Sequence, residues 1–489
     1  MHRIAKLPMP LCCAGSQSFS PVAPCNPCAK LDESDLDFGP DLDWIANEAS
    51  LRPELSQRLR SIRNNRVPGR QFYVSKVAGI GNPSFDHEPA YQDLKLPDGG
   101  FQLLALYRFW NIIEYWSPYR DVMGEDWNRI LTQFIPRVAL ADSAEAYQRE
   151  LLAFIAKVHD GHANLWSSLA VRPPVGKCQL PVNVRFVEGL PVISGLSGAA
   201  PSDSALKIGD VITALDGVPV GTLIENWKPY YATSNDVARM RDIGHYMTRG
   251  ECSDARIGIH RQNPDLTFTV KRVPSSINDY DPGKHDLPGP GFRLLSKDVA
   301  YLKLSSVKEA DCTHYVKDAA GTKGLIIDIR NYPSEFVVFA LGSHLVENDL
   351  SNPGAFRWTK PLSLNPEEPH YSEKIVILVD ESSMSQAEYT TMAFRAAHGA
   401  IVIGSTTSGA DGNVSPFALP GGLHTMISGI GVFYPDKSST QRIGIVPNIE
   451  ARPTIAGIRA GRDEVLEKAL RQILGRQVTA ADIEKMARP

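Results

Sequence analysis

Two segments in the first third of the chain place apolar residues every three or four positions. These residues are Leu103, Leu106, Trp110 and Ile113 in one segment, and Tyr147, Leu151, Ile155 and Val158 in the other. Such spacing puts one apolar stripe on one face of an α-helix. Asp142 with Glu145 three residues later predicts the start of the second helix. We therefore expect a helical N-terminal domain over residues 41–175.

The pattern changes to short β-rich runs from Pro181 onward. Runs at 182–187 and 190–193, and an alternating run at 256–273, are typical of strands. Between them, Gly209 and Gly217 supply turn conformations around a further short apolar strand. These runs predict a β-rich module over residues 176–275.

Strands and helices alternate after a linker at 276–291 that is rich in Pro, Gly and Asp. The apolar segments are 300–304, 324–329, 336–345, 375–379, 387–397 and 400–403, and a periodic run at 465–473 predicts a last helix. This order favours an α/β core with a mostly parallel sheet over residues 292–476. Residues 1–40 lack periodicity and predict a disordered tail, and residues 477–489 are expected to form a C-terminal tail.

Composition narrows the class of protein. The 489 residues are enough for about three domains, and 43% hydrophobic residues, 22% charged residues and a net charge of -4 are typical of a soluble globular protein. Without a basic excess, nucleic acid is not expected as a partner. No apolar stretch approaches the roughly 20 residues of a spanning helix, so no transmembrane segment is expected.

The seven cysteines are spread thinly and odd in number, which does not indicate a disulfide framework. Cys25 and Cys28 form a lone C-x-x-C pair. Its two interpretations are a zinc or redox site, or incidental thiols in a tail, and we favour the second.

The most informative stretch runs from an apolar strand, 374–379, through small residues into a helix. Ser385 lies in that turn, next to the unpaired N–H groups and the positive dipole of the helix start, where an oxyanion would be stabilised. From local sequence alone the serines of this turn are either helix caps or include a nucleophile.

The segment from Val379 to Glu388 resembles the motif "V-N-x-x-S-A-S-A-S-E" of the tail-specific (C-terminal-processing, S41) serine peptidases. This resemblance implies that Ser385 is the nucleophile, that Glu388 is a structural residue, and that the N–H of Gln386 is an oxyanion donor. Residues 205–220 resemble the PDZ signature of bacterial proteases. The module at 176–275 is therefore expected to bind extended peptides.

The segment 325–335 resembles the family motif "L-I-x-D-L-R-x-N-x-G-G", which includes Arg330. Ser334 stands where the family has the glycine that donates the other oxyanion N–H. Because serine tolerates positive φ poorly, we expect another loop conformation or another presentation of this N–H.

The general base differs from that of the Ser-Lys branch of the family. Residues 404–411 resemble "G-x-x-T-x-G-K-G", but Ala410 replaces the lysine. Residues 158–165 resemble "D-G-H-x-x-L", whose histidine is the base in the tricorn-like branch, which implies His162 as the base. A histidine titrates near neutrality, as a base requires. His159 is the less favoured alternative.

The third catalytic member stays open. Residues 444–449 resemble the family segment "G-V-x-P-D-I", near which Gln441 occupies the position of a glutamate that orients the site. Glu450 is a nearby substitute for that carboxylate.

Taken as a member of this family, closer to its tricorn-like Ser-His branch, the chain is expected to have a crotonase-like α/β core and to hydrolyse polypeptides through an acyl-enzyme. The resemblance implies no metal or organic cofactor, capture of a substrate's C-terminal carboxylate, and a place outside the cytoplasm, in the periplasm or cell envelope, with the cytoplasm as alternative. A rival interpretation is an inactive relative that binds peptides, which Ala410, Ser334 and Gln441 favour. A small-molecule carrier has no specific feature in its support.

Overall fold

The computed structural model describes residues 40–65, 72–197, 200, 204–261, 263–275, 285–346, 369–434, 436–475 and 478–488. The chain divides into two units, residues 1–75 and 76–489. The described part of the first unit contains η3 (Asp43–Ala46), α2 (Glu48–Leu51) and α3 (Pro53–Asn64). The tail expected at 1–40 falls, up to residue 39, outside the described residues, as do Cys25 and Cys28.

The second unit begins with the helices that the periodicity predicts. These are α4 (Gly99–Trp116) and α6 (Ala144–Ile155), with α5 (Trp127–Ala139) between them. The start of α6 differs from the prediction, because Ser143 and not Asp142 is the N-cap: its backbone is extended and its side chain accepts a hydrogen bond from the N–H of Ala146. Trp127 stacks on Phe154 with ring centroids 5.0 Å apart, so aromatic side chains fill the space between these helices.

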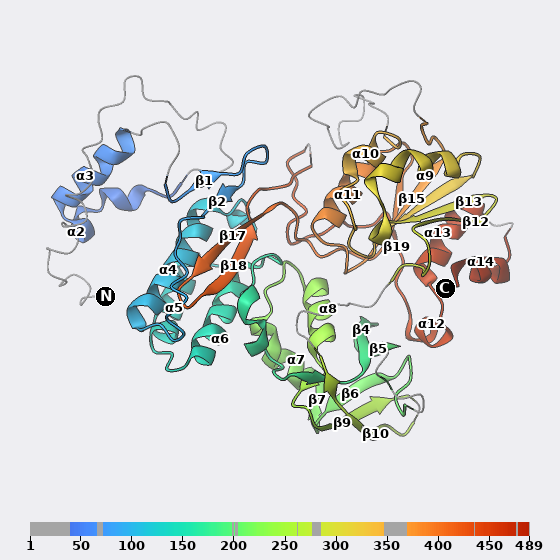
Figure 1. The fold of residues 1–489 in the computed structure, drawn as a ribbon, viewed down its shortest axis with the longest axis horizontal. Helices are drawn as coiled ribbons and strands as arrows, with labels where there is room; N and C mark the ends of the chain where they lie inside the picture. Colours follow the sequence, from blue (N-terminus) through green and yellow to red (C-terminus); the bar gives the residue numbers. More distant parts are fainter. Residues whose placement is uncertain are drawn as a thin grey trace. The chain divides into compact units, whose positions relative to one another are not determined.

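A hairpin from much later in the chain packs on these helices. It consists of β17 (Val414–Leu419) and β18 (Leu423–Ser428), the orange arrows beside α4, α5 and α6 in Figure 1. Arg108 donates to the carbonyl of Ala418 at 2.7 Å and Tyr147 to that of Pro420 at 2.9 Å. A segment that we expected within the core thus belongs with the helices, and its last residue, Ser428, lies beside the turn that follows α6.

The β-rich module contains a six-stranded sheet of order β10-β9-β6-β5-β4, with β7 paired to β6. Its strands are β4 (Val182–Val187), β5 (Leu190–Leu196), β6 (Val211–Leu215), β7 (Val218–Pro219), β9 (Asp254–His260) and β10 (Leu266–Lys271), and its helices are α7 (Val220–Trp227) and α8 (Asp236–Tyr246). The strand predictions for this module are confirmed. β4 is the last strand at one edge of this sheet. Helix α8 packs closely against it, since a Cβ on Gly244 of α8 would lie 3.0 Å from the carbonyl oxygen of Val184.

The module also contains a disulfide bond between Cys178 and Cys252, which the cysteine count did not predict. The two residues are 74 positions apart, but β3 (Cys178–Gln179) pairs with β8 (Arg249–Gly250) in a three-stranded sheet with β11 (Val273–Pro274). This pairing brings the two Cα atoms within 5.0 Å. Strand register, which spacing along the sequence does not show, is therefore the reason for the bond.

The core is a six-stranded sheet of order β12-β13-β14-β15-β16-β19, parallel from β13 onward. Its strands are β12 (Phe292–Ser296), β13 (Val299–Lys303), β14 (Gly324–Asp328), β15 (Lys374–Val379), β16 (Ile401–Gly404) and β19 (Ile449–Glu450). β13 and β14 are buried at every position, as expected for strands covered on both faces.

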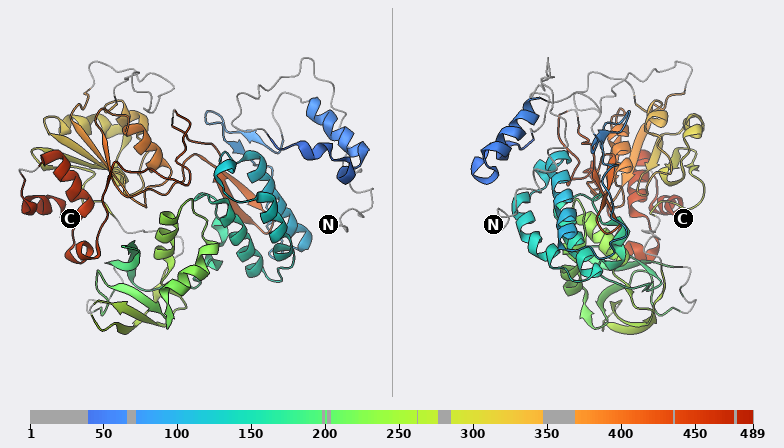
Figure 2. Two further views of the ribbon diagram at one scale, coloured as in Figure 1. Left: turned by 180° about the vertical axis from the view of Figure 1, so that it is seen from behind. Right: turned by 60° about the vertical axis from the view of Figure 1, so that its left-hand side comes forward.

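Helices cover both faces of this sheet, as Figure 2 shows. One face carries α9 (Cys312–Ala319), α10 (Val338–Gly342) and α11 (Gln386–Phe394), and the other carries α13 (Glu464–Leu474) and α14 (Ala480–Ala487). The predicted mixed α/β class is confirmed. The C-terminal tail expected at 477–489 is instead largely helix α14, because Ile483 and Ala487 are buried on the same apolar cluster as α13.

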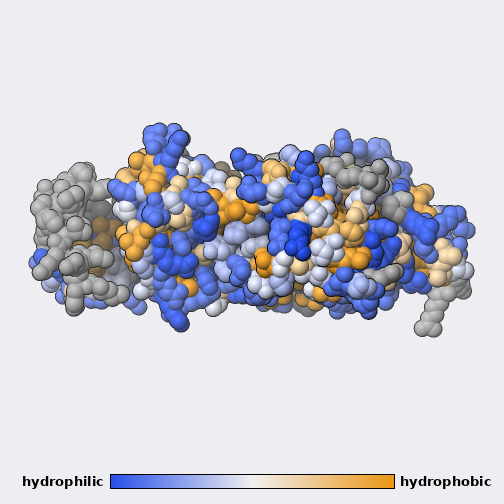
Figure 3. Space-filling model, turned by 90° about the horizontal axis from the view of Figure 1, so that it is seen from below, coloured by the Kyte–Doolittle hydropathy of each residue, from blue (hydrophilic) through white to orange (hydrophobic). Residues whose placement is uncertain are grey.

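The remaining elements are short: β1 (Ser75–Lys76), β2 (Pro83–Ser84), α12 (Ile455–Ala460), and the 3₁₀ helices η4 (Arg120–Val122), η5 (Ala156–Val158), η6 (Trp166–Val171), η7 (Lys228–Tyr230), η8 (Leu304–Ser306) and η9 (Glu309–Asp311). Within the described ranges, no helix is both long and apolar enough to span a bilayer. The face drawn in Figure 3 is mostly hydrophilic, with apolar residues in small patches.

Candidate active site

The residues of the family-like motifs follow the carboxyl ends of neighbouring parallel strands. Residues 329–334 follow β14, residues 380–385 follow β15, and residues 405–411 follow β16. This edge of an open parallel sheet is where ligands bind in α/β proteins. Gly404 allows the last two loops to meet, because it has a φ of 142° and a Cβ there would lie 1.8 Å from the carbonyl oxygen of Val379.

Arg330 anchors the loop after β14 instead of reaching toward Ser385. Its guanidinium is buried and binds the carboxylates of Asp328 at 2.6–2.9 Å and Asp463, the N-cap of α13, at 2.8 Å. Ser383 donates to the carbonyl of Ile329 at 2.8 Å. The turn that carries Ser385 is thereby attached to the rigid end of β14.

Ser385 lies at the junction of this turn and α11. Its backbone has φ 55° and ψ -117°, a conformation that non-glycine residues adopt rarely and that is concentrated at functional sites. Its N–H donates to the carbonyl of Ala410 at 2.8 Å. The next N–H, that of Gln386, is the first of α11, where a helix leaves its donors without internal acceptors.

Glu388 is fully buried and joins α11 to the loop after β16. Its carboxylate accepts hydrogen bonds from the N–H groups of Ser385 (3.2 Å), Gly409 (2.7 Å) and Ala410 (2.9 Å), and from the hydroxyl of Thr407. Burial raises the pKa of Glu388, although these hydrogen bonds oppose the rise. The arrangement fits a structural role for Glu388.

Ser334 lies near the first turn of α11, because Gln386 donates from its side chain to the carbonyl of the adjacent Glu335 at 2.8 Å. The N–H of Ser334, expected to face an oxyanion, donates instead to the carbonyl of Leu304 at 2.9 Å. Its hydroxyl donates to the carbonyl of Val307 at 2.6 Å. In this conformation the N–H of Ser334 is engaged within the protein.

His162 lies in the turn after η5, and this turn lies close to Ala410 and to the turn at residues 380–385. A Cβ on Gly161 would lie 3.0 Å from the Cβ of Ala410 and 3.8 Å from the sulfur of Met384, the residue before Ser385. Within the described residues no hydrogen bond joins the side chains of His162 and Ser385. The structure thus brings together the two loops that carry these residues.

The imidazole of His162 is buried, and its Nδ1 lies 2.9 Å from the hydroxyl of Ser428 and 3.6 Å from Oδ1 of Asp160. Burial alone would raise the pKa of Asp160, but the contacts with His162 and with the N–H of Ser428 lower it below its ordinary value. Asp160 is therefore ionised at neutral pH.

The other candidates for the base and for its orientation have other partners than this imidazole. Nε2 of His159 is 3.4 Å from Glu125, and burial lowers the pKa of His159. The side chain of Gln441 contacts Ser234 at 3.4 Å, and Ser234 accepts the N–H of Gly161. Glu450 is exposed and pairs with Arg452 at 2.6 Å.

Sequence reasoning did not identify Asp160 or Ser428. Asp160 belongs to the "D-G-H" segment and could have been considered from its place two residues before His162. Ser428 is 266 positions away and carries no such signal.

Asp411 follows Ala410 and is a buried carboxyl group with an incomplete set of partners. Its Oδ1 accepts the N–H of Gly412 at 2.8 Å, whereas its Oδ2 has no partner among the described residues. Burial, together with the nearby Glu388, raises the pKa of Asp411 well above its ordinary value.

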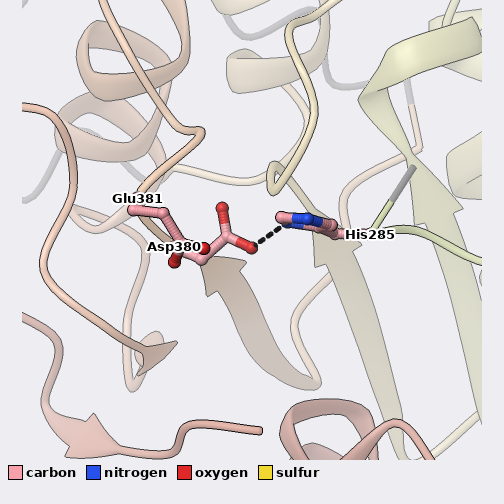
Figure 4. A group of neighbouring side chains, drawn as sticks. All are labelled: His285, Asp380 and Glu381. Carbon is pink, nitrogen blue, oxygen red and sulfur yellow. Dashed lines mark hydrogen bonds and ion pairs between the residues drawn. The ribbon is translucent and has the colours of Figure 1, made fainter. Parts of the chain in front are cut away.

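His285, Asp380 and Glu381 form a further polar cluster at the start of the turn at residues 380–385, shown in Figure 4. Their donor atoms lie within 4.8 Å of one another, so they could in principle hold a metal ion. However, Arg185 of β4 binds Glu381 at 2.7 Å and Asp380 at 3.1 Å, and His285 binds Asp380 at 2.6 Å. Burial opposes the ionisation of Asp380, but His285 and Arg185 lower its pKa. Since the arginine supplies the compensating charge, we assign the cluster as an ion-pair network between β4 and this turn.

A cavity of about 570 Å³ lies beside this network, between β4 and α8. Arg241 of α8 also binds the turn at residues 380–385, donating to the carbonyl of Glu381 at 2.8 Å. Much of the lining from β4 and α8 is apolar and consists of Val184, Phe186, Val187, Val237 and Met240. We call this cavity the α8–β4 groove.

Comparison with known proteins agrees with this architecture. Residues 298–451, which span β13 to β19, match the model of peptidase family S41. No curated protein matches the chain.

Among solved structures, mature CPAF complexed with lactacystin is similar at a TM-score of 0.59 and 15% identity, over 77% of this chain and 99% of that one. A second structure, of mature CPAF, is similar at a TM-score of 0.57 and 14% identity, over 78% of this chain and 99% of that one. The photosystem II D1 C-terminal processing protease gives a TM-score of 0.43 at 14% identity, over 79% and 99%. At such identities the likeness to CPAF concerns the fold.

Proposed function

We propose that this protein is a serine-type peptidase that hydrolyses polypeptides through an acyl-enzyme on Ser385. The observation that carries the proposal is a serine held at positive φ at the start of α11, on the carboxyl edge of a parallel sheet and within the S41-matched residues. A capping serine would not require this backbone conformation, because N-cap residues normally have φ near the β-region.

His162 is the general base of the proposed reaction. Its Nε2 accepts the proton of the Ser385 hydroxyl while Oγ attacks the carbonyl carbon of the substrate, and the same proton passes to the leaving amine. Water then hydrolyses the ester with the same base. Ala410 cannot act as a base, so the proposal favours the Ser-His, tricorn-like branch of the family over the Ser-Lys branch.

The N–H of Gln386 and the dipole of α11 stabilise the oxyanion in this mechanism. Ser334 provides a second donor only after its N–H leaves the carbonyl of Leu304. This engaged N–H favours the rival function, an inactive relative that binds peptides, and makes a direct test of Ser385 decisive.

The α8–β4 groove is the proposed binding site for the substrate chain. β4 is an end strand, so an extended polypeptide could pair with its free edge and place apolar side chains against α8. We include capture of a C-terminal carboxylate, the usual ligand of PDZ modules, in this proposal.

The disulfide between Cys178 and Cys252 supports a compartment outside the reducing cytoplasm, because such bonds persist mainly in oxidising environments. We therefore propose an extracytoplasmic location for this protein.

The test of the proposed function is labelling by a fluorophosphonate probe together with hydrolysis of an unfolded polypeptide. The wild type and a Ser343→Ala control should react and hydrolyse, whereas Ser385→Ala should do neither and should melt near the wild type, since a lost cap costs about 1 kcal/mol. Undiminished hydrolysis by Ser385→Ala would refute the assignment. A wild-type protein that neither reacts with the probe nor hydrolyses the polypeptide would favour the rival function, an inactive relative that binds peptides.

A further inference from the structure

The imidazole of His162 is part of a buried polar network built from two distant segments. Asp160 and His162 lie on the turn after η5, and Ser428 ends β18. The three residues are 5%, 5% and 1% exposed. Polar groups at this depth are hydrogen-bonded as a rule, and their geometry restricts where the hydrogens lie.

The contacts of Asp160 determine the direction of each hydrogen bond. Its Oδ2 accepts the N–H of Ser428 at 2.8 Å, and its Oδ1 accepts the N–H of His162 at 3.0 Å and the hydroxyl of Ser428 at 3.0 Å. An ionised carboxylate only accepts, so the single hydroxyl hydrogen of Ser428 is directed at Asp160. The oxygen of Ser428 must then accept from Nδ1 of His162 across the remaining 2.9 Å.

We propose that Asp160 and Ser428 are positioning residues that hold His162 in the tautomer protonated at Nδ1, which leaves Nε2 free to accept the proton of Ser385. This inference rests on the proposed function and assigns the third catalytic role that the motifs left open. The serine is a required link, because the direct separation of 3.6 Å between Nδ1 and Oδ1 of Asp160 is too long for a good hydrogen bond.

The residues that the family motif suggested for this role have other partners. The side chain of Gln441 contacts Ser234, and Glu450 is paired with Arg452 at the surface. Asp160 is the carboxylate that pairs with His162 among the described residues.

Steady-state kinetics of Asp160→Asn and Ser428→Ala test the proposal. Both variants should lower kcat, with little change in KM, by between about 10-fold and the roughly 10⁴-fold that general-base catalysis supplies. Because a carboxylate favours a protonated imidazole beside it, Asp160→Asn should also move the acidic limb of the kcat/KM profile to lower pH. Ser428→Thr, which keeps the hydroxyl, should restore most of the activity.

Ser415→Ala is the matched control. Ser415 is a fully buried serine of β17 in the same hairpin, and its hydroxyl donates to the carbonyl of Pro83 without contacting His162. The control should lose stability but keep the pH profile. If Asp160→Asn and Ser428→Ala gave the profile and kcat of Ser415→Ala, the positioning role would be refuted while the proposed function stood.

A measurement that does not depend on activity separates the two proposals. ¹⁵N NMR of histidine-labelled protein distinguishes a protonated ring nitrogen from an unprotonated one, and His162→Gln assigns the signal. Above the titration range Nδ1 should carry the hydrogen in the wild type, and Asp160→Asn should redistribute it. A hydrogen on Nε2 in the wild type would overturn the inference, whereas absence of probe labelling with the hydrogen on Nδ1 would count against the peptidase function alone.

Discussion

Removing the carboxylate of Glu388 should destabilise the loop that holds Ser385 more than any other single truncation in α11. Glu388→Ala would leave the backbone N–H groups of Gly409 and Ala410 and the hydroxyl of Thr407 without their acceptor, whereas the N–H of Ser385 would keep the carbonyl of Ala410. Each unsatisfied buried donor costs roughly 1–3 kcal/mol, so these two N–H groups and the hydroxyl together correspond to about 3–9 kcal/mol. Water entering the cavity and relief of the cost of burying the charge offset part of this loss. We expect the free energy of unfolding to fall by about 3–5 kcal/mol.

Glu388→Gln refines this prediction. The amide keeps the shape and one acceptor oxygen, but its nitrogen faces donors that the second oxygen served, so a smaller loss of about 1–2 kcal/mol is expected. Urea denaturation measures both variants. Glu450→Ala is the control, because it removes an exposed ion pair worth at most about 1 kcal/mol. If Glu388→Ala unfolded at the same urea concentration as Glu450→Ala, the inference that Glu388 holds this loop would be refuted.

Three further outcomes follow from other features. Burial raises the pKa of Asp411 above its ordinary value of 3.8, so the stabilising contribution of this carboxyl group is present below that value and is lost as pH rises through the raised pKa. Asp411→Asn should therefore raise the melting temperature at pH 8 but not at pH 4. An equal effect at both pH values would contradict this reasoning. Cys178→Ser removes a crosslink between residues 74 positions apart and should lower the free energy of unfolding, measured by denaturation, by roughly 2–4 kcal/mol. An unchanged free energy of unfolding under oxidising conditions would exclude a formed bond with Cys252. Met240→Lys in the α8–β4 groove should raise KM for long polypeptides more than for short reporter peptides, and Val218→Lys, on exposed β7, should not; equal effects on both lengths would argue against substrate binding there.

Local sequence patterns predicted the helices and strands whose apolar residues directly reflect which of their faces are buried. The three-to-four spacing gave α4 and α6, and continuous apolar runs gave β13 to β16, because those strands are covered on both faces. The association of the β17–β18 hairpin with the N-terminal helices was not predictable in this way. It depends on contacts such as Arg108 with Ala418, 310 positions apart, which leave no periodic signal.

In the candidate site, too, the features formed by adjacent residues were predictable and those formed by distant residues were not. The strand, turn and helix around Ser385 were predicted from adjacent residues, and the structure has this arrangement. The roles of Ser385, His162, Ser334 and Gln386 remain predictions. The partner of His162 was not found from sequence, because Ser428 reaches it only through the fold.

The backbone of Ser385 has a consequence for how this position would change over evolutionary time. At φ 55° and ψ -117° a glycine would be less strained than any residue with a side chain, so Ser385→Gly should stabilise the folded protein even as it removes the hydroxyl. Stability alone would therefore favour glycine here, and only a requirement for the hydroxyl would oppose it. In a lineage that kept peptide binding and abandoned hydrolysis, drift toward glycine at this position is the change to expect first.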